Sequence, residues 1–459
     1  MSLLTISNVS VYVGDTQLLA PVTLTLQEGE RLTILGQTGS GKSLLAQAIM
    51  GNLPKALTRR GQIDLFGKTN LSLKEQKALW GKHISMLPQE PWNSLDPLMS
   101  AERQLTDTEY YVAGKTWSTA LSDSLAKLKK LGLGHIGQKR VDQLSGGMAQ
   151  RVAIACATAG GANLVIADEP TKGLDVSRRD QVVASLKEQT EGGALLTITH
   201  DVAVARQLPG KLIVVKNGQV VEQGESSDIL SNPAHDFTKA LIGADPLQWP
   251  NSENSPSSQE KLISADAISV KRGKQTLFNG LSLDIHKNEI VGIVGDSGCG
   301  KSTLGDALLG LLPVESGCVV KHEETQPQRW QKLYQDPTAS VTHSVSLQTL
   351  LEDLIKLHKL DASKAAPLMK RLGLTHELMQ RTASEVSGGE LQRFCLLRAL
   401  MLEPVFLFAD EPTSRLDPLT QKDVSELLVQ VAKEQGCSVV LVSHDPNMIE
   451  KRCDRVIRL

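Results

Sequence analysis

The pattern GxxxxGK[ST] occurs twice in this chain, as 36-GQTGSGKS-43 and as 295-GDSGCGKS-302. Each copy lies between an apolar run and a segment expected to be helical. The glycines of such a loop let backbone N–H groups surround phosphates at a helix N-terminus, the lysine adds positive charge, and the serine hydroxyl can bind Mg²⁺. We therefore expect two phosphate-binding loops, made of Gly36, Gln37, Thr38, Gly39, Ser40, Gly41, Lys42 and Ser43 and of Gly295, Asp296, Ser297, Gly298, Cys299, Gly300, Lys301 and Ser302.

Two adjacent carboxylates follow an apolar run in each half of the chain: Asp168 with Glu169, and Asp410 with Glu411. In a phosphate-transferring site the aspartate can hold Mg²⁺, directly or through water. The glutamate, one residue later, is placed to polarise the attacking water. The alternative is an acidic pair that only caps a loop at the end of a strand. The phosphate-binding loop upstream of each pair favours the catalytic interpretation.

Further polar residues recur at matching places in the two halves. His200 and His444 end a second apolar run downstream of each acidic pair, and Gln89 and Gln335 lie between the phosphate-binding loop and that pair. A single histidine is usually structural or solvated, and a single glutamine is a weak signal. Their repeated order favours a contact of the histidines with a γ-phosphate and places the glutamines in the same two sites.

The second half of the chain repeats the first at a drifting offset. The run 164-LVIADEPT-171 aligns with 406-FLFADEPT-413 at a smaller offset than the two phosphate-binding loops do. This indicates two copies of one domain whose loops differ in length. The segment 250-PNSENSPSSQE-260 is typical of a flexible linker. We predict domains at residues 1–245 and 262–459, joined by a flexible linker at 246–261, with a shortened C-terminus in the second domain.

Within each half the pattern predicts a mixed α/β fold. Residues 22-VTLTLQEGERLTILG-36 alternate and then become continuously apolar, which predicts an antiparallel hairpin leading into a buried strand. A helix is predicted from Lys42 to about Met50, and the amphipathic stretch 121-LSDSLAKLKKLGL-133 predicts another. Short apolar runs typical of central parallel strands are 164–168, 195–199, 405–410 and 438–444.

Composition argues against several classes of protein. Lys and Arg total 49 against 51 Asp and Glu, and aromatic residues make up 3% of the chain. Nucleic-acid binding, which relies on excess positive charge and on stacking aromatics, is therefore not expected. The cysteines form no CxxC pair, and the N-terminus shows no signal-peptide pattern. The uncharged run at 152–167 is too short and too polar to span a bilayer, so we expect a soluble, cytoplasmic chain.

The order of these motifs resembles the nucleotide-binding domain of ABC ATPases, and the resemblance covers nearly the whole chain twice. It includes a stretch without usual catalytic side chains, 144-LSGGMAQR-151 and 386-VSGGELQR-393. The resemblance implies ATP and Mg²⁺ as ligands. It also implies tandem P-loop NTPase domains, each with a mixed sheet core, an antiparallel β subdomain and a helical subdomain. The metal-binding residues it implies are Ser43, Gln89, Asp168, Ser302, Gln335 and Asp410.

In this family two domains pack head to tail, and the SGG stretch of one closes on the nucleotide held by the other. The glycine pair permits close backbone approach, and the serine and N–H groups can bind the γ-phosphate. By the resemblance, one site combines Lys42, Ser43, Asp168 and Glu169 with Ser387, Gly388 and Gly389. The other combines Lys301, Ser302, Asp410 and Glu411 with Ser145, Gly146 and Gly147.

The two copies also depart from the family pattern. Tyr12 stands where the family usually stacks an aromatic ring on adenine, but the matching position is Lys271, beside Arg272. Met148 and Glu390 replace the commoner glutamine after the SGG stretch, and Arg415 interrupts 413-TSRLD-417. Both glutamates and both histidines are present. We therefore expect two hydrolysing sites of unequal affinity.

The first half resembles the oligopeptide, dipeptide and nickel importer subfamily in 86-MLPQEPWNSLDPLMS-100 and in 232-NPAHDFTKALIGADP-246. The two SGG stretches are similar to those of the two distinct ATPase subunits of nickel importers, here fused. The resemblance implies two transmembrane permeases, an extracytoplasmic solute-binding protein, and a place on the cytoplasmic face of the inner membrane. No cysteine lies between Cys156 and Cys299, which argues against the iron–sulfur cluster of some peptide importers. Nickel or a metal chelate is therefore favoured over peptides.

Two other functions fit tandem ABC domains. One is a soluble ATPase that acts on ribosomes, but the linker of that class is long, helical and charged. The other is a fused sugar-importer ATPase, which the tail at 232–246 argues against.

Overall fold

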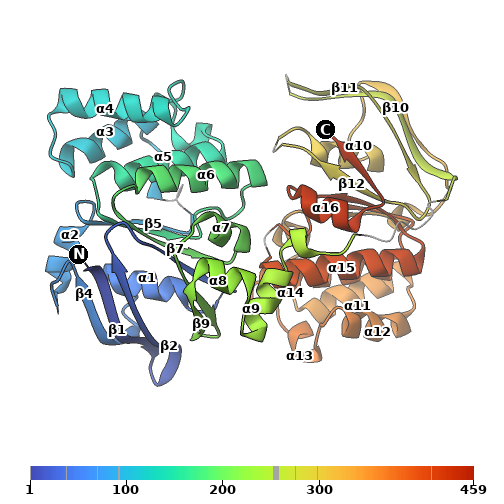
Figure 1. Ribbon diagram of the computed structural model, residues 1–459. Coiled ribbons are helices and arrows are strands. Elements are labelled where there is room, and N and C mark those ends of the chain that lie inside the picture. The colour runs from blue at the N-terminus through green and yellow to red at the C-terminus, as the bar shows by residue number, and fades with distance from the viewer. Residues whose placement is uncertain are drawn as a thin grey trace. The chain divides into compact units, whose positions relative to one another are not determined.

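The structure is a computed structural model that describes residues 2–37, 39–69, 71–90, 94–251, 258–273, 275–296, 298–414 and 416–459. The chain divides into two compact units, Met1–Asp245 (unit 1) and Pro246–Leu459 (unit 2). Each unit combines a mostly parallel sheet, a smaller antiparallel sheet and helices, which confirms the predicted α/β class (Figure 1). Of the predicted residues, Thr38, Ser297, Arg415 and linker residues 252–257 lie outside the described ranges.

The central sheet of unit 1 has six strands in the order β5–β6–β7–β3–β8–β9. All neighbouring pairs are parallel except β8 with β9. Successive residues of β6 enter different cores, with Ile166 on one face and Ala167 on the other, because both faces of the sheet are covered. The strands are β3 (Arg31–Gly36), β5 (Ile84–Leu87), β6 (Leu164–Asp168), β7 (Ala194–Thr199), β8 (Lys211–Lys216) and β9 (Gln219–Glu225).

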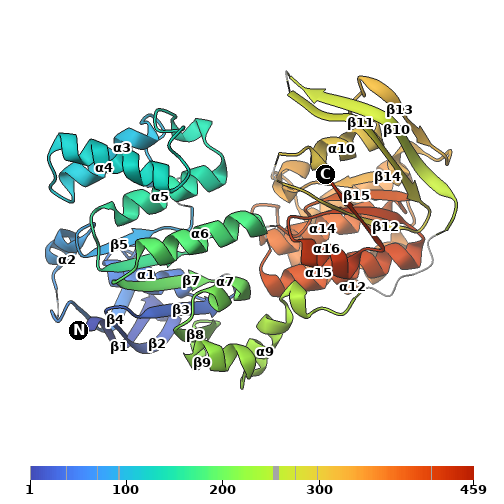
Figure 2. The same ribbon diagram turned by 45° about the horizontal axis from the view of Figure 1, so that its top comes forward.

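A three-stranded antiparallel sheet, β2–β1–β4, and helix α1 share a core with one face of the central sheet. Residues of α5, α6 and α7 pack against the other face, and α3 and α4 lie outside them, at the end of unit 1 away from β1 and β2 (Figure 2). The bounds are β1 (Ser2–Val13), β2 (Thr16–Gln27), β4 (Leu57–Leu65), α1 (Lys42–Met50), α2 (Leu73–Leu79), α3 (Ala101–Tyr111), α4 (Trp117–Lys130), α5 (Gly146–Ala159), α6 (Val176–Gln189), α7 (Val202–Gln207), α8 (Ser226–Ser231) and α9 (Asp236–Gly243).

The residues of the predicted hairpin at 22–36 belong to two different sheets. The alternating part lies in β2, which pairs antiparallel with the preceding strand β1. The continuously apolar part is β3, which lies between β7 and β8 in the central sheet. The alternating pattern thus correctly predicted that one face of β2 is covered. The strand that pairs with β2 is the preceding strand β1, which the pattern did not predict. The predicted helix from Lys42 to Met50 is confirmed as α1.

Unit 2 repeats this architecture with five parallel strands in the order β14–β15–β16–β12–β17 and an antiparallel sheet β11–β10–β13. Helix α10 shares one core with β10 and β11, and α11 to α16 line the core on the other face (Figure 1). The strands are β10 (Lys261–Arg272), β11 (Gln275–His286), β12 (Ile290–Val294), β13 (Ser316–Lys321), β14 (Trp330–Leu333), β15 (Phe406–Asp410), β16 (Ser438–Val442) and β17 (Arg455–Arg458). The helices are α10 (Lys301–Leu309), α11 (Leu347–His358), α12 (Ala365–Arg371), α13 (His376–Met379), α14 (Gly388–Met401), α15 (Pro418–Gln435) and α16 (Pro446–Arg452).

The predicted flexible linker begins with ordered structure. Pro246–Gln248 forms a 3₁₀ turn, and the Trp249 side chain is buried in the core of unit 2. The Arg452 guanidinium lies 4.3 Å from the centre of the Trp249 ring, a stacking arrangement that favours a fixed position. The first residues of the predicted linker are therefore part of unit 2 rather than free chain.

Candidate functional site

The carboxyl ends of the central strands bring the predicted residues of unit 1 to one edge of the sheet. Gly36 ends β3, Asp168 ends β6, and Thr199 ends β7 directly before His200. Both β3 and β6 pair with β7 in parallel, so these three ends lie side by side. The phosphate-binding loop, the acidic pair and the histidine therefore meet within one unit.

The loop after β3 enters α1 without a capping side chain. The N-cap residue is Gly41, with φ of 87° and no side-chain hydrogen bond to the first turn. Gly39 also has a positive φ, of 80°, a conformation that favours glycine. The first-turn N–H groups and the positive end of the helix dipole then form an anion site. Helix α10 of unit 2 begins in the same way after Gly300, so both loops fit the predicted phosphate-binding role.

Lys42 is buried beside its own loop. Its Nζ donates hydrogen bonds of 2.6 Å to the carbonyl oxygens of Gly36 and Gln37. The same atom lies 4.0 Å from Oε1 of Glu169. The lysine charge is therefore held between the phosphate-binding loop and the predicted catalytic carboxylate.

Ser43 and Asp168 are brought together as predicted for a metal site. The Ser43 hydroxyl donates a hydrogen bond of 3.1 Å to Oδ1 of Asp168. Burial raises the pKa of Asp168 to about 6, although the bond from Ser43 acts in the opposite direction. Two hard oxygen donors thus lie together at the base of the phosphate-binding helix.

Glu169 has an unusual backbone conformation. Its φ is 49°, in the left-handed region that costs energy for residues with a Cβ, and its N–H donates to the carbonyl of Ile198 at 2.8 Å. This bond to the end of β7 fixes the direction of the Glu169 side chain, whose Oε2 lies 2.7 Å from Nδ1 of His200. Burial favours the neutral imidazole, but the contact with Glu169 outweighs it and raises the pKa of His200.

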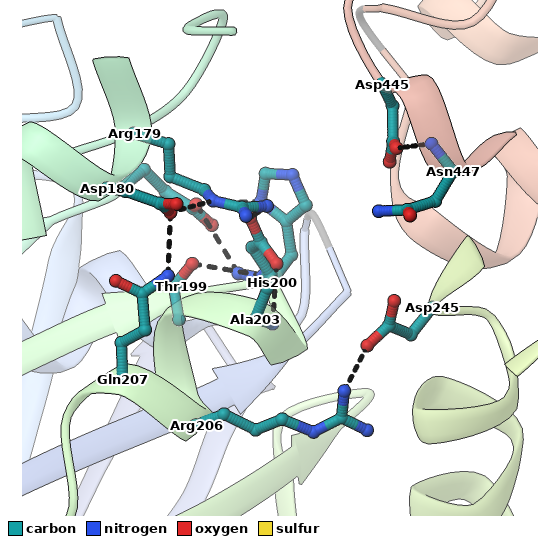
Figure 3. A network of polar contacts seen from close by, with 12 residues as sticks. Arg179, Asp180, Thr199, His200, Ala203, Arg206, Gln207, Asp245, Asp445 and Asn447 are labelled. Carbon is teal, nitrogen blue, oxygen red and sulfur yellow. Dashed lines mark hydrogen bonds and ion pairs between the residues drawn. The ribbon is translucent and has the colours of Figure 1, made fainter. Parts of the chain in front are cut away.

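A polar network holds the loop that carries His200 (Figure 3). Asp201 caps α7 by accepting from the Ala203 N–H at 2.7 Å, and its other oxygen lies 3.4 Å from Arg179 on α6. Asp180 accepts from both Arg179, at 3.1 Å, and Gln207, at 2.7 Å. Helix α6 therefore positions the residues that follow β7.

Unit 2 builds the same constellation. The Lys301 Nζ donates to the carbonyl of Gly295 at 2.7 Å and lies 4.0 Å from Oε1 of Glu411. Nε2 of His444 lies 2.7 Å from that same oxygen of Glu411. Glu411 also has a positive φ, of 48°. Burial raises the pKa of Asp410, against a hydrogen bond from Ser302.

The two predicted glutamines differ in their contacts. The Gln335 Nε2 donates a hydrogen bond of 2.6 Å to Oε2 of Glu411, so this side chain joins the predicted catalytic group. Among the residues that the structure describes, Gln89 forms no hydrogen bond with Glu169, whose Oε2 is instead contacted by His200.

One charged residue beside the candidate site was missed by the sequence analysis. Lys332, on β14, lies 3.8 Å from Oδ2 of Asp410 and 2.7 Å from Oδ1 of Asp306. Its signal in the sequence was a lysine three positions before Gln335, where the first half has Met86 before Gln89. A charge that is largely buried needs a partner, and Lys332 finds one beside the predicted metal-binding aspartate.

Comparison with known proteins agrees with this geometry. The family model described as "ABC transporter" matches residues 19–172 and 278–414. The chain belongs to this family. An ABC transporter ATP-binding protein of Escherichia coli, YejF, is 31% identical over 100% of this chain and 94% of its own length. The glutathione import ATP-binding protein GsiA of Shigella flexneri is 29% identical over 99% of this chain and 84% of its own length. The predicted family and ATPase class are thereby confirmed.

Solved structures agree on the ABC ATPase fold. A structure described as RNase-L inhibitor covers 98% of this chain with a TM-score of 0.71, at 22% sequence identity. A complex containing an archaeal ribosome recycling factor covers 96% with a TM-score of 0.70, at 21% identity. At these identities the likeness concerns the tandem ABC fold alone.

The SGG stretches of this ABC ATPase begin helices α5 and α14. The Ser145 hydroxyl accepts the Met148 N–H at 3.4 Å, and the Ser387 hydroxyl accepts the Glu390 N–H at 3.3 Å. A Cβ added at Gly146 would meet no atom within 4 Å, and the same holds at Gly388. Packing within its own unit therefore does not require a glycine at either position. The second glycines are more confined, since a Cβ at Gly147 would lie 3.2 Å from Arg178 and one at Gly389 3.1 Å from Thr420.

The aromatic position of the two ABC domains differs as predicted from the sequence. In unit 1 the Arg60 guanidinium lies 4.4 Å from the centre of the Tyr12 ring, and Gln17 donates to the Tyr12 hydroxyl at 2.9 Å. In unit 2 Lys271 instead forms an ion pair of 2.7 Å with Glu315. The ring of Tyr12 is thus held in place, whereas Lys271 is already engaged with a carboxylate.

The residues of both units fit Mg²⁺. Ser43 with Asp168, and Ser302 with Asp410, supply hydroxyl and carboxylate oxygens, which Mg²⁺ prefers. Within the described ranges, no cluster of three or more His, Cys, Asp or Glu residues forms a protein-only metal cage. Magnesium typically uses one or two protein ligands together with substrate phosphates, as this donor set allows.

Proposed function

We propose that this chain is the ATP-binding and hydrolysing subunit of a membrane importer of the peptide class, with two hydrolysing sites. The observation that carries the proposal is the repeated contact of lysine, glutamate and histidine: Lys42, Glu169 and His200 in unit 1, and its counterpart in unit 2. Equivalent constellations in both units support two active sites rather than one active and one silent site.

In each proposed site the residues have different roles in phosphate transfer. The first-turn N–H groups and Lys42 bind and orient the phosphates, and Lys301 does so in unit 2. The Glu169 carboxylate orients a water and accepts its proton, while His200 holds that carboxylate in place and reaches towards the γ-phosphate. When bound by Ser43 and Asp168, with Gln89, Mg²⁺ would neutralise phosphate charge.

Each proposed site is completed by the SGG stretch of the opposite unit. The support is chemical: Gly146 and Gly388 have no reason within their own units to be glycine, and a backbone that must closely approach a phosphate gives them one. Ser387, Gly388 and Gly389 then serve the nucleotide of Lys42. Ser145, Gly146 and Gly147 serve that of Lys301. Closure is driven by ATP because the γ-phosphate is bound on both sides only in the closed state.

The proposed cargo is a short peptide or a peptide-like molecule. YejF of Agrobacterium fabrum, described as a peptidoglycan transport ATP-binding protein, is 32% identical over 95% of this chain. GsiA is described as a glutathione import ATP-binding protein. These descriptions support peptide-like cargo over the nickel or metal chelate that the SGG stretches favoured. Cargo is chosen by a solute-binding protein and two permeases, which this chain energises from the cytoplasmic face of the inner membrane. No helix in the described part of the chain is long and apolar enough to cross a bilayer.

Action on ribosomes is the alternative, because one of the two whole-chain structural matches is described as containing an archaeal ribosome recycling factor. The relatives that are more similar in sequence match 95–100% of this chain and are described as transport proteins. Affinity purification from membranes solubilised in detergent separates the two functions. Co-purification of two permeases supports the importer, and co-purification of ribosomes contradicts it.

Uptake tests the cargo. A deletion strain complemented with the wild-type chain should accumulate labelled tripeptide, and one complemented with Glu169→Gln/Glu411→Gln should not. Labelled nickel serves as the competing substrate in the same strains. Restored nickel uptake without peptide uptake would contradict the proposed cargo and leave the ATPase assignment intact.

A further inference from the structure

Unit 2 holds a buried cation beside its metal-binding aspartate. The Lys332 side chain is 7% exposed, and its Nζ lies 2.7 Å from Oδ1 of Asp306 on α10 and 3.8 Å from Oδ2 of Asp410 at the end of β15. The centres of the Tyr334 and Phe408 rings lie 5.2 and 5.8 Å from the same Nζ. Two carboxylates and two aromatic rings thus fix the position of this charge.

Unit 1 has no charge at either corresponding position. Lys332 on β14 pairs with Phe408 on β15 in the register that Met86 on β5 has with Ile166 on β6. Asp306 follows Lys301 in α10 at the same spacing at which Gln47 follows Lys42 in α1. One difference between the two ATP sites is therefore an exchange of Met86 and Gln47 in unit 1 for Lys332 and Asp306 in unit 2.

The pair of Lys332 and Asp306 adds no net charge to unit 2, but it changes the electrostatic potential at Asp410. Asp306 is partly exposed, whereas Lys332 and Asp410 are both buried, so the positive end of the pair faces Asp410 where solvent screening is weaker. A cation at that place competes with Mg²⁺ for the charge of Asp410. The same cation attracts nucleotide phosphates when no metal is bound.

We propose that Lys332 serves as a counter-ion of Asp410. It thereby makes ATP binding in unit 2 less dependent on Mg²⁺ than ATP binding in unit 1. The inference rests on the proposed function, since it requires both units to bind ATP with Mg²⁺. The quantity concerned is the ratio of the Kd for nucleotide in EDTA to the Kd in saturating Mg²⁺. This ratio is smaller for unit 2, by about five- to tenfold for one added charge near a partly buried site.

Binding of the fluorescent analogue mant-ATP to the full chain measures this ratio. The substitution Lys42→Ala removes the nucleotide of unit 1, so that the signal reports unit 2 alone. In that background Lys332→Met/Asp306→Gln reproduces the pair found in unit 1 without changing the net charge. The ratio should rise by about five- to tenfold, mainly through weaker binding in EDTA.

The reciprocal exchange tests unit 1 in the same way. In a Lys301→Ala background, Met86→Lys/Gln47→Asp should lower the ratio by a similar factor. A matched control exchanges an ion pair of unit 2 away from the site, Lys364 with Glu403, as Lys364→Met/Glu403→Gln. This control should leave the ratio unchanged.

The outcomes separate the inference from the proposed function. An unchanged ratio in Lys332→Met/Asp306→Gln, with normal binding in saturating Mg²⁺, overturns the role of Lys332 and leaves the two-site ATPase standing. Absence of mant-ATP binding by the Lys42→Ala chain in saturating Mg²⁺ would contradict the proposed function, and the inference with it.

Discussion

Nδ1 of His200 lies 2.7 Å from Oε2 of Glu169. The backbone N–H of His200 lies 3.4 Å from the same oxygen, so this carboxylate is held by two parts of one residue. The glutamate itself leaves β6 with a positive φ, and Glu411 leaves β15 in the same conformation. A strained backbone that recurs at both glutamates indicates that their direction matters for the chemistry.

Glu169→Gln and Glu411→Gln, made singly, should each lower ATP turnover without abolishing it. Glutamine keeps the shape but cannot accept a proton, a loss of about 10²–10⁴ at the affected site. The double variant should show no turnover above background in a steady-state phosphate-release assay. If one single variant kept full turnover and the other had none, the claim of two hydrolysing sites would be wrong.

Tyr12→Ala should weaken nucleotide binding by unit 1, because the Tyr12 ring is held in place by Arg60 and Gln17 where adenine is expected to stack. Loss of one stacking partner costs about 1–3 kcal/mol, or roughly 5- to 150-fold in Kd. Lys271→Tyr should tighten binding by unit 2. Titration of mant-ATP in Lys301→Ala and Lys42→Ala backgrounds isolates the two units. Equal Kd values for unit 1 with and without the Tyr12→Ala substitution would refute the stacking role.

Asp168→Asn should stabilise the nucleotide-free protein, and only at higher pH. Because burial raises the folded-state pKa of Asp168 to about 6, the carboxyl favours folding when protonated. That contribution is complete below the unfolded value near 3.8 and is lost as the pH rises through about 6. The free energy of unfolding of the wild-type protein falls by about 3 kcal/mol as a result, whereas that of the asparagine variant does not.

Urea unfolding in EDTA at about pH 5 and about pH 7.5 measures this difference. The difference in free energy of unfolding between Asp168→Asn and wild type should be larger at the higher pH. Asp142→Asn, at an exposed aspartate, controls for the loss of one charge. A gap that stays constant with pH would show that Asp168 is not the titrating group.

Glu109→Ala should destabilise the helical part of unit 1. The Glu109 carboxylate is fully buried between α3 and α4, with Oε2 2.6 Å from Lys115 Nζ and Oε1 2.5 Å from Lys127 Nζ. Removing it takes away the ion-pair partner of Lys127, whereas Lys115 keeps its pair with Asp123 at 2.8 Å, and both lysines are about a third exposed and can be hydrated. We expect a loss of about 2–3 kcal/mol, less than for a pair buried on both sides.

Glu188→Ala is the matched control, since its pair with Lys130 is exposed at both ends. Such a pair contributes at most about 1 kcal/mol. Similar midpoints for the two variants in urea unfolding would contradict the structural role of Glu109.

The sequence predicted those parts of the sites that depend on local pattern. Helix α1 was predicted from Lys42 to about Met50 because the pattern that indicates a helix is local to this segment. The sequence placed Asp168 and His200 at the ends of two apolar runs, and the two residues meet at one sheet edge because parallel strands end together. The family motifs supplied the roles of those residues.

What the sequence did not predict depends on segments that meet only in the fold. The contact of Lys332 with Asp306 and Asp410 joins three elements far apart in the chain. Trp249 was assigned to a flexible linker because the polar residues after it dominated the local composition, but a single aromatic side chain is enough to anchor a segment. The prediction of which strand pairs with β2 was wrong, because an alternating pattern indicates a covered face and does not identify the neighbouring strand.

The head-to-tail sharing of the two ATP sites is the central claim, and the rate of ATP hydrolysis by two double variants tests it most directly. Lys42→Ala/Ser387→Arg damages a single shared site twice and should hydrolyse ATP as fast as Lys42→Ala alone. Lys42→Ala/Ser145→Arg damages both sites and should show no activity above background. The opposite result, with Ser145→Arg harmless and Ser387→Arg abolishing the remaining activity, would show that each unit uses its own SGG stretch and would contradict the account.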